Sequence, residues 1–186
     1  MKKRIFRPAI LIVLMVALAG CKGIFGPERN GEFRLSSERF GTENYYLFGF
    51  GYEQAEFYRF EYKGEPIPDI INDGYRLIEG GEVTVLPGFN TPAEVNGFAL
   101  VGEFTSLEDG KSFYEDYEQV EAGLQFEVFS DTVELYQVWI QQTSLGNYVK
   151  LFVKNIETLE GEAGNIYSEV TLEYTYQPNG STDFPG

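Results

Sequence analysis

Residues 166–177, with the sequence IYSEVTLEYTYQ, decide the fold class of this chain. Every second residue of an extended segment lies on the same side. One side is apolar: Ile166, Val170, Leu172, Tyr174 and Tyr176. The other side is mostly polar: Tyr167, Glu169, Thr171, Glu173, Thr175 and Gln177. One apolar and one polar face are typical of a strand in an antiparallel sheet.

Other stretches repeat this strand pattern. Aromatic residues alternate through residues 44–62, which predicts two strands with a turn near Gln54. Residues 75–79 and 82–86 flank Gly80-Gly81, which favours a two-residue hairpin turn. Further strands are predicted at residues 32–36, 98–104, 124–129, 133–142 and 148–156. The remaining stretches are predicted as connections: residues 66–74, 87–97 and the acidic segment 157–164.

One segment, residues 106–123, predicts a helix. Ser106 and Asp109 fit a capping box, and Gly123 is a suitable C-terminal stop. Gly110 weakens the first turn slightly. An apolar stripe follows helical spacing: Phe113, Tyr117, Val120 and Leu124. We expect this stripe to pack the helix against a sheet edge or barrel end.

These patterns together predict an all-β, mainly antiparallel fold. The domain is expected over residues 32–180, as a single β-sandwich or flattened barrel with one packed α-helix. Residues 181–186 are predicted to be a frayed tail. No internal repeat and no second domain boundary is visible in the sequence.

The N-terminus has the composition of a secretory signal. A basic start is followed by an apolar run over residues 9–19 that ends in Leu18-Ala19-Gly20-Cys21. This ending resembles the bacterial lipobox. The resemblance implies a signal peptide over residues 1–20, a diacylglycerol thioether on Cys21 and N-acylation after cleavage. A chance cysteine after a signal peptide and an uncleaved membrane anchor are the alternatives.

The lipobox implies a membrane partner and a location. Residues 21–31 are then a lipidated tether, and the protein is lipid-anchored in the cell envelope. Lys22 follows the cysteine where Asp is associated with inner-membrane retention, so we expect the outer membrane, on its periplasmic face or at the cell surface.

Composition excludes several function classes. Without residues 1–20 the chain keeps 10 Lys and Arg against 29 Asp and Glu, a net charge of −19, which disfavours nucleic acid as a partner. This mature part contains no His and no Met, and its only Cys is the predicted lipid site. Catalytic triads, the usual zinc sites and haem ligation by His or Met are therefore excluded. We expect no cofactor, no metal and no enzyme activity.

The C-terminal end resembles a known family. Residues 146–151, GNYVKL, and residues 169–181, EVTLEYTYQPNGS, are similar to the ends of HmuY-like lipoproteins from Bacteroidetes-type bacteria. In those proteins a Gly-x-Tyr-x-Lys-Leu strand pairs with a final Tyr-rich strand. The likeness covers about the last forty residues and implies an all-β, outer-membrane or surface domain. Family members bind haem through His or Met, so haem capture does not carry over to this chain.

Aromatic residues are the candidate ligand contacts. Tyr46, Phe48 and Tyr52 share one face of the first aromatic strand, and Trp139 is the only Trp. Such residues can form the core of a sandwich or an exposed platform that stacks on sugars. Both interpretations remain open at this stage, with the core favoured.

Carboxylates are the remaining candidates for chemistry. Glycoside hydrolysis needs only two of them at a suitable separation, and five lie on predicted strands: Glu103, Glu127, Glu134, Glu169 and Glu173. Calcium is conceivable where Glu79 faces Glu82, and at Asp69 with Asp73. Neither place has an Asp-x-Asp-x-Asp-Gly loop, so a solvated acidic surface is the expectation.

The sequence thus favours a non-catalytic, envelope-anchored domain that binds a protein partner or a small ligand. The alternative is a carbohydrate-binding or carbohydrate-cleaving domain that uses aromatic stacking and paired carboxylates.

Overall fold

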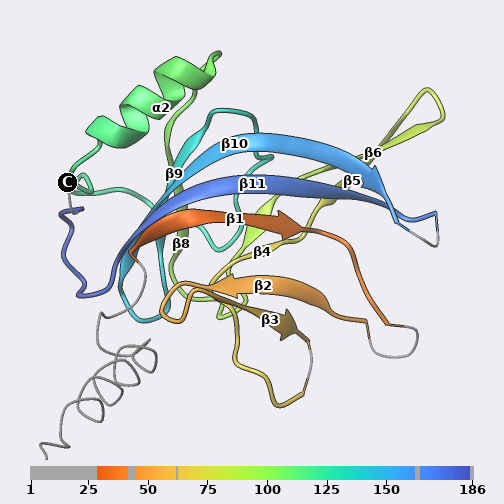
Figure 1. The fold of residues 1–186 in the computed structure, drawn as a ribbon, viewed down its shortest axis with the longest axis horizontal. Helices are drawn as coiled ribbons and strands as arrows, with labels where there is room; N and C mark the ends of the chain where they lie inside the picture. The colour runs from red at the N-terminus through yellow and green to blue at the C-terminus, as the bar shows by residue number, and fades with distance from the viewer. Residues whose placement is uncertain (1–28, 42–44, 62, 162–163, 185–186) are drawn as a thin grey trace, which may run out of the picture.

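The computed structural model describes residues 29–41, 45–61, 63–161 and 164–184. Its largest element is an antiparallel five-stranded sheet (Figure 1). The strands in spatial order are β1 (Asn30–Ser36), β11 (Ile166–Gln177), β10 (Tyr148–Glu160), β9 (Val138–Gln142) and β8 (Gly97–Gly102). The described part contains one α-helix, α2 (Leu107–Asp116). The predicted all-β, mainly antiparallel fold with one packed helix is confirmed.

The strand that the sequence pattern singled out lies inside this sheet. β11 pairs with β1 on one side and with β10 on the other, and Leu172 lies opposite both Phe33 and Val153. From Val170 to Tyr176 its apolar residues are at most 2% exposed. Ile166 is 37% exposed, because that end of the strand extends past the core. The predicted alternation is confirmed over the part that the core covers.

The second layer of the sandwich consists of three separate two-stranded pieces. They are β2 (Leu47–Gly51) with β3 (Glu56–Phe60), β4 (Ile71–Asn72) with β7 (Phe89–Asn90), and β5 (Tyr75–Glu79) with β6 (Glu82–Leu86). Phe50 and Phe89 from these pieces belong to one core cluster with Leu172 of the large sheet. Phe50 stacks on Phe33 of β1 with 4.1 Å between ring centroids.

Gly49 of β2, the first aromatic strand, lies where another segment of the chain approaches closely. A Cβ at Gly49 would lie 2.7 Å from the carbonyl oxygen of Ile70. The glycine therefore allows another backbone to approach β2 closely. Residues 66–74, which were predicted as a connection, supply this backbone and contain the short strand β4, and the predicted connection 87–97 contains its partner strand β7.

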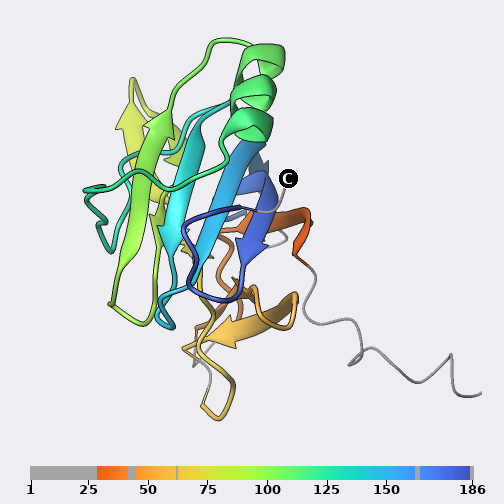
Figure 2. The same ribbon diagram turned by 90° about the vertical axis from the view of Figure 1, so that its left-hand side faces the viewer.

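The outer face of the large sheet is partly covered by α2 (Figure 2). Tyr114 of the helix packs against Val138 and Phe152 of β9 and β10. Ser106 caps the N-terminus by accepting a hydrogen bond from the backbone N–H of Asp109. Gly110 faces the sheet, and a Cβ there would lie 2.8 Å from the carbonyl oxygen of Tyr136. The glycine weakens the helix but allows it to lie close to the sheet.

The predicted helix was too long. It ends at Asp116 instead of Gly123, because the following backbone pairs with the C-terminal segment. Val120 N–H donates to Thr182 O, and Phe184 N–H donates to Glu118 O. Phe184 is 6% exposed, so the prediction of a frayed tail is wrong for residues 181–184. The predicted apolar stripe still packs together, in one cluster with Phe184.

One predicted strand does not form, and three others have different boundaries. Residues 124–129 form only isolated bridges, such as Phe98 with Glu127. β9 begins at Val138 instead of Val133, after Tyr136 adopts a positive φ of 66° that no strand accommodates. β10 continues to Glu160, into the predicted acidic connection, because β11 pairs with it that far. β1 begins two residues early, inside the predicted tether.

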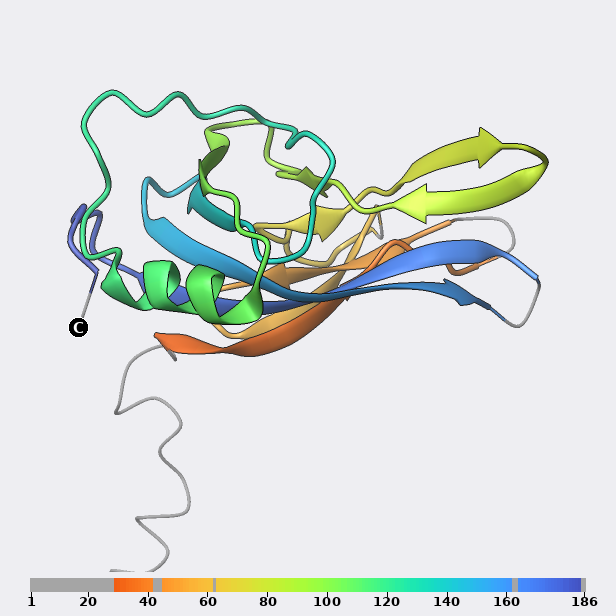
Figure 3. The ribbon, with the colours of Figure 1, turned by 90° about the horizontal axis from the view of Figure 1, so that it is seen from above.

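The hairpin was predicted correctly, including its register. Glu79 lies opposite Glu82, and Gly80 and Gly81 both have positive φ, as a primed turn requires. The hairpin extends away from the rest of the molecule, and every residue of β5 is exposed (Figure 3).

The predicted signal peptide, Cys21 and most of the tether lie outside the described residues. Within the described part, no helix has the length and apolar character needed to span a membrane.

Candidate functional site

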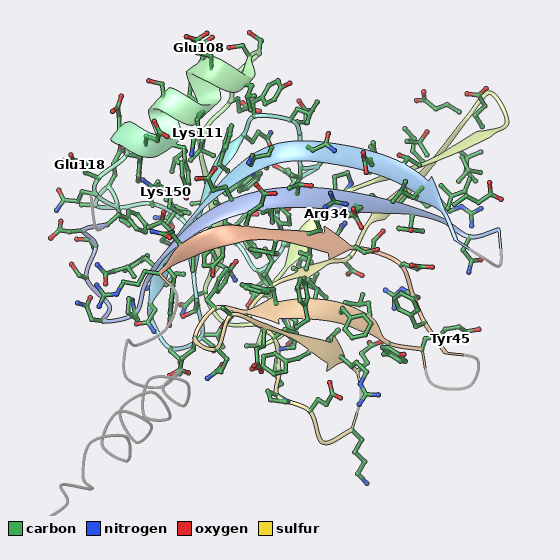
Figure 4. All side chains as sticks on the ribbon, in the orientation of Figure 1. Arg34, Tyr45, Glu108, Lys111, Glu118 and Lys150 are labelled. Atoms are coloured by element: carbon green, nitrogen blue, oxygen red, sulfur yellow. The ribbon has the colours of Figure 1, made fainter. Side chains whose placement is uncertain are left out.

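A groove of about 620 Å³ lies beside α2 on the outer face of the large sheet. The start of β1, the middle of β10 and β11, and one side of α2 form its walls. Its charged side chains are three of each sign: Glu32, Glu115 and Glu173, and Lys111, Lys150 and Lys154. Figure 4 shows Lys111 and Lys150 between the helix and the sheet.

Lysines are concentrated in this groove. Three of the four lysines in the described ranges line it, and only Lys63 lies elsewhere. The whole chain has a net charge of −15, so a cluster of ammonium groups is unusual for this surface. The charged residues of the groove balance, three Lys against three Glu, although the protein as a whole is strongly acidic.

Lys150 differs from the other two lysines because it is buried. Only 5% of the residue is exposed, and its Nζ donates a hydrogen bond of 2.8 Å to the carbonyl oxygen of Tyr117. The Nζ lies 4.7 Å from the ring centroid of Tyr114 and 5.3 Å from that of Phe184. Among the described residues, no carboxylate lies within ion-pair distance of this amine.

Burial also changes the acidity of Lys150. Removal from water, followed by the nearby charge of Lys111, lowers its pKa to about 8. Glu115, Asp116 and Glu118 oppose this shift only in part. An anion bound in the groove would favour the protonated amine and raise this pKa again.

The position of Lys150 follows from the fold. Helix α2 has no basic residue in its last turn, and Tyr117 is its C-cap. A cation near the C-terminus of a helix is stabilised by the helix dipole. β10 supplies that cation from the neighbouring sheet, which holds the amine in one place.

Two ion-paired lysines form the walls of the groove. Lys111 Nζ lies 2.6 Å from Glu173 and 3.3 Å from Glu115, and Lys154 pairs with Glu32. The side chains of Lys111 and Lys154 are about one third exposed, at 32% and 35%. Partly exposed pairs of this kind contribute little to stability, so a ligand can separate them at low cost.

Neutral polar groups complete the floor. Tyr114 and Thr175 share a hydrogen bond of 2.8 Å between their hydroxyl oxygens. Burial raises the pKa of the Tyr114 phenol well above its ordinary value, so it stays neutral. The groove therefore offers ammonium and hydroxyl groups, which suit a carboxylate or phosphate on a small ligand.

Two of the residues predicted as ligand contacts are buried instead. Trp139 is 4% exposed, and its indole N–H donates to Gln137. Tyr52 is fully buried, and its hydroxyl donates to Gln141 at 2.7 Å. Both side chains belong to the core cluster, where a ligand cannot reach them. For Tyr52 and Trp139 the core interpretation holds, and the prediction of ligand contacts is corrected.

The other two predicted contacts lie together at the surface. Tyr46 and Phe48 pack edge to face, 5.7 Å apart, and both contact Phe40. The guanidinium of Arg59 lies 5.8 Å from the Tyr46 ring. Phe48 is 37% exposed. Phe40 and Tyr46 are stacked at 27°, but the Phe48 ring stands at 68° and 87° to them, so the three rings do not form the flat row that stacks on sugars.

The five candidate carboxylates do not gather in one place. Glu173 pairs with Lys111 in the groove, Glu169 pairs with Arg34, and Glu103 accepts a hydrogen bond from Gln137. Glu127 and Glu134 are exposed, and neither they nor Glu103 lie on the strands predicted for them.

Asp69 and Asp73, one of the two pairs considered for calcium, have separate partners. Asp69 accepts a hydrogen bond from the backbone N–H of Tyr52, and burial raises the pKa of its carboxyl group. Asp73 pairs with Arg39 at 2.9 Å. Within the described ranges, no three acidic side chains converge as a metal-binding group.

The lysines of the groove were not predicted as site residues. A signal for Lys150 was present in the sequence, since it is a charged residue in the otherwise apolar run Val149–Val153. Such a residue must have a partner or a function. Lys111 and Lys154 gave no signal, because only the fold brings them to the same groove.

Compared with known proteins, the chain matches no protein-family model, and no curated protein is significantly similar to it in sequence. The resemblance to HmuY-like lipoproteins therefore stays a prediction from the residues quoted for it.

Proposed function

We propose that this chain is an envelope lipoprotein, anchored through Cys21, whose β-sandwich domain binds a small acidic ligand in the groove beside α2. The observation that carries the ligand proposal is Lys150, a buried amine without a carboxylate partner among the described residues. The proposed role is binding and transport or retention of the ligand, without catalysis.

The groove has the features of a small-ligand site. It is concave, and its floor combines the aromatic ring of Tyr114 with a few fixed polar groups. The Lys150 amine loses hydrating water when the protein folds. A carboxylate or phosphate bound in the groove would compensate for part of this loss. The same anion can also contact Lys111 when the exposed pair with Glu115 opens.

The anchor would hold this groove near the membrane. Asn30, which lines the groove, comes nine positions after Cys21, and a chain of that length spans at most about 30 Å. A lipid on Cys21 therefore limits the distance between the groove and the bilayer surface.

Calorimetric and NMR titrations with succinate and inorganic phosphate test the ligand proposal. We expect saturable binding of one of these probes to the full chain, with shifts of the side-chain signals of Lys111 and Lys150. The variant Lys111→Gln should weaken binding, whereas Lys63→Gln, outside the groove, should not. Groove signals that stay unchanged at millimolar probe concentrations would contradict the proposal.

The anchor has its own test in the host cell. Globomycin should block processing of the chain, and Cys21→Ser should release it from the membrane fraction. A Cys21→Ser protein that remains membrane-bound would show that the lipid is not what holds it. This result leaves the ligand proposal untouched, since the groove does not involve Cys21.

A further inference from the structure

Among the described residues, the outer edge of β5 has no neighbouring strand. β5 pairs only with β6 there, and the hairpin lies at the same end of the molecule as the far ends of β10 and β11 (Figure 3). All five residues of β5 are exposed, among them Tyr75 at 45%, Leu77 at 40% and Ile78 at 64%. Apolar side chains on an exposed edge are typical of a surface that pairs with another chain.

The register determines which backbone groups are available. Because the turn has two residues, Glu79 and Glu82 form a hydrogen-bonded pair. Hydrogen-bonded and non-hydrogen-bonded pairs alternate along an antiparallel ladder. The N–H and C=O groups of Arg76 and Ile78 therefore point away from β6, and no backbone partner for them exists within the described residues.

β5 lacks most features that protect edge strands. Folded proteins block such edges with proline, lysine, bulges or a covering loop. From Tyr75 to Glu79 the strand has no proline, no lysine and no register shift, and Arg76 is its only cation. At its base, the Tyr75 hydroxyl donates to Ser130 O, which fixes the strand to the body of the protein.

The charged residues of this edge indicate which charges a partner strand should have. Glu79 and Glu82 face each other at the tip, and neither has an ion pair among the described residues. A cation opposite Glu79 would relieve this repulsion. Arg76, three positions earlier, favours a carboxylate opposite it.

A second copy of β5 does not supply these charges. In antiparallel pairing, residues whose backbone groups point outward face each other, so Arg76 can lie opposite Arg76 or Ile78 but never opposite Glu79. Two copies would also bring together two chains of net charge −15.

We propose that the free edge of β5 pairs antiparallel with an extended segment of another protein, in which a Lys or Arg lies opposite Glu79 and a carboxylate lies opposite Arg76. Two apolar residues between those charges pack beside Leu77 and Ile78. The backbone hydrogen bonds provide affinity, and the charges set the direction.

A peptide titration of the full chain tests this pairing. The probe is a short peptide, Thr-Lys-Val-Val-Glu-Thr, which places its charges as the proposal requires. The comparison peptide, Thr-Glu-Val-Val-Lys-Thr, has the charges exchanged. NMR signals of the Leu77 and Ile78 methyl groups should shift with the first peptide, at several-fold lower concentration than with the second.

Two variants separate the backbone edge from the side chain. Ile78→Pro removes an N–H that the β5–β6 ladder does not use, so the hairpin should remain while the affinity falls about tenfold. Ile78→Thr keeps the N–H and should bind within about threefold of the original chain. Circular dichroism and the Val83 methyl signals confirm that the hairpin persists in both variants.

Three outcomes would overturn the inference. They are β5 signals that do not respond to the matched peptide, equal binding by Ile78→Pro and Ile78→Thr, and concentration-dependent pairing of β5 between copies of this chain. The groove titrations use other residues and other signals, so failure here is distinguishable from failure of the proposed function.

Discussion

The two ends of this molecule distribute polar and apolar residues in opposite ways. Near α2, lysines and glutamates lie under a helix, and one amine, Lys150, is buried. At the β5–β6 hairpin, leucine and isoleucine side chains extend into water without cover. Both arrangements depart from the usual burial of these residue types.

This difference indicates where the protein is expected to bind a ligand or a partner. The core between the two layers follows the usual rules, with aromatic and aliphatic residues close to fully buried. The two ends depart from these rules in opposite ways: one is polar and enclosed, and the other is apolar and open. Each deviation lowers the stability of the isolated chain, and each is relieved by a different kind of partner, an anion in the first case and a strand in the second.

The largest expected effect contrasts one large side chain from each end, Tyr114 and Leu77. Tyr114→Ala should lower the free energy of unfolding by about 3–5 kcal/mol, because Tyr114 packs against Val138 and Phe152 and supports the Lys150 amine. Leu77→Ala in the hairpin should change it by less than about 0.5 kcal/mol. Urea unfolding measures both values. Equal losses at the two sites would remove the proposed contrast.

Gly110 should show that the α2 end is closely packed. Gly110→Ala raises helix propensity, yet we expect a loss of about 1–3 kcal/mol, because the new methyl group would meet Tyr136 and Phe152. Ser112→Ala, on the exposed side of the same helix, is the matched control and should stabilise slightly. A gain in stability from Gly110→Ala would mean that α2 can move away from the sheet.

Affinity for an acidic probe should depend on pH through Lys150. The amine is charged below its pKa of about 8 and loses its charge as the pH rises through that value. We therefore expect inorganic phosphate or succinate to bind about tenfold more weakly at pH 9 than at pH 7. The other titratable groups facing Lys150 are Lys111, Glu115, Asp116 and Glu118. Lys150→Met should bind weakly at both pH values, and a pH-independent affinity of the original chain would contradict the assignment.

The smallest expected effect concerns the hairpin tip. Glu82→Lys replaces the like-charged pair with Glu79 by an opposite-charged pair and should stabilise the hairpin by about 0.2–1 kcal/mol. Hydrogen exchange of the β5 and β6 amides measures this change, and Glu82→Gln should give about half of it. If the amide hydrogens of both variants exchange at the original rate, the repulsion between Glu79 and Glu82 does not affect the stability of the hairpin.

Local patterns in the sequence predicted the parts of the fold that depend on neighbouring residues. The β5–β6 hairpin follows from Gly80 and Gly81, and the two faces of β11 follow from its alternation. The end of α2 could not be predicted in this way. The backbone after Asp116 forms hydrogen bonds with the C-terminal segment, which is more than sixty residues away in the sequence.

The candidate site was less predictable than the fold, for the same reason. The sequence analysis selected aromatic residues, and two of them became part of the core: Trp139 points inward from β9 of the large sheet, and Tyr52 does so from the end of β2 in the other layer. The groove joins residues of β1, α2, β10 and β11, which share no local pattern. Lys150 alone was out of place in its own strand.

The long strand β11 connects these two ends. It has 12 residues and therefore extends roughly 40 Å from the groove, beside the point where the chain would leave for the membrane, to the hairpin end. Such a sheet bends little. If the lipid anchor exists, β11 acts as a spacer of constant length, and any protein captured at the hairpin would be kept at a defined height above the bilayer.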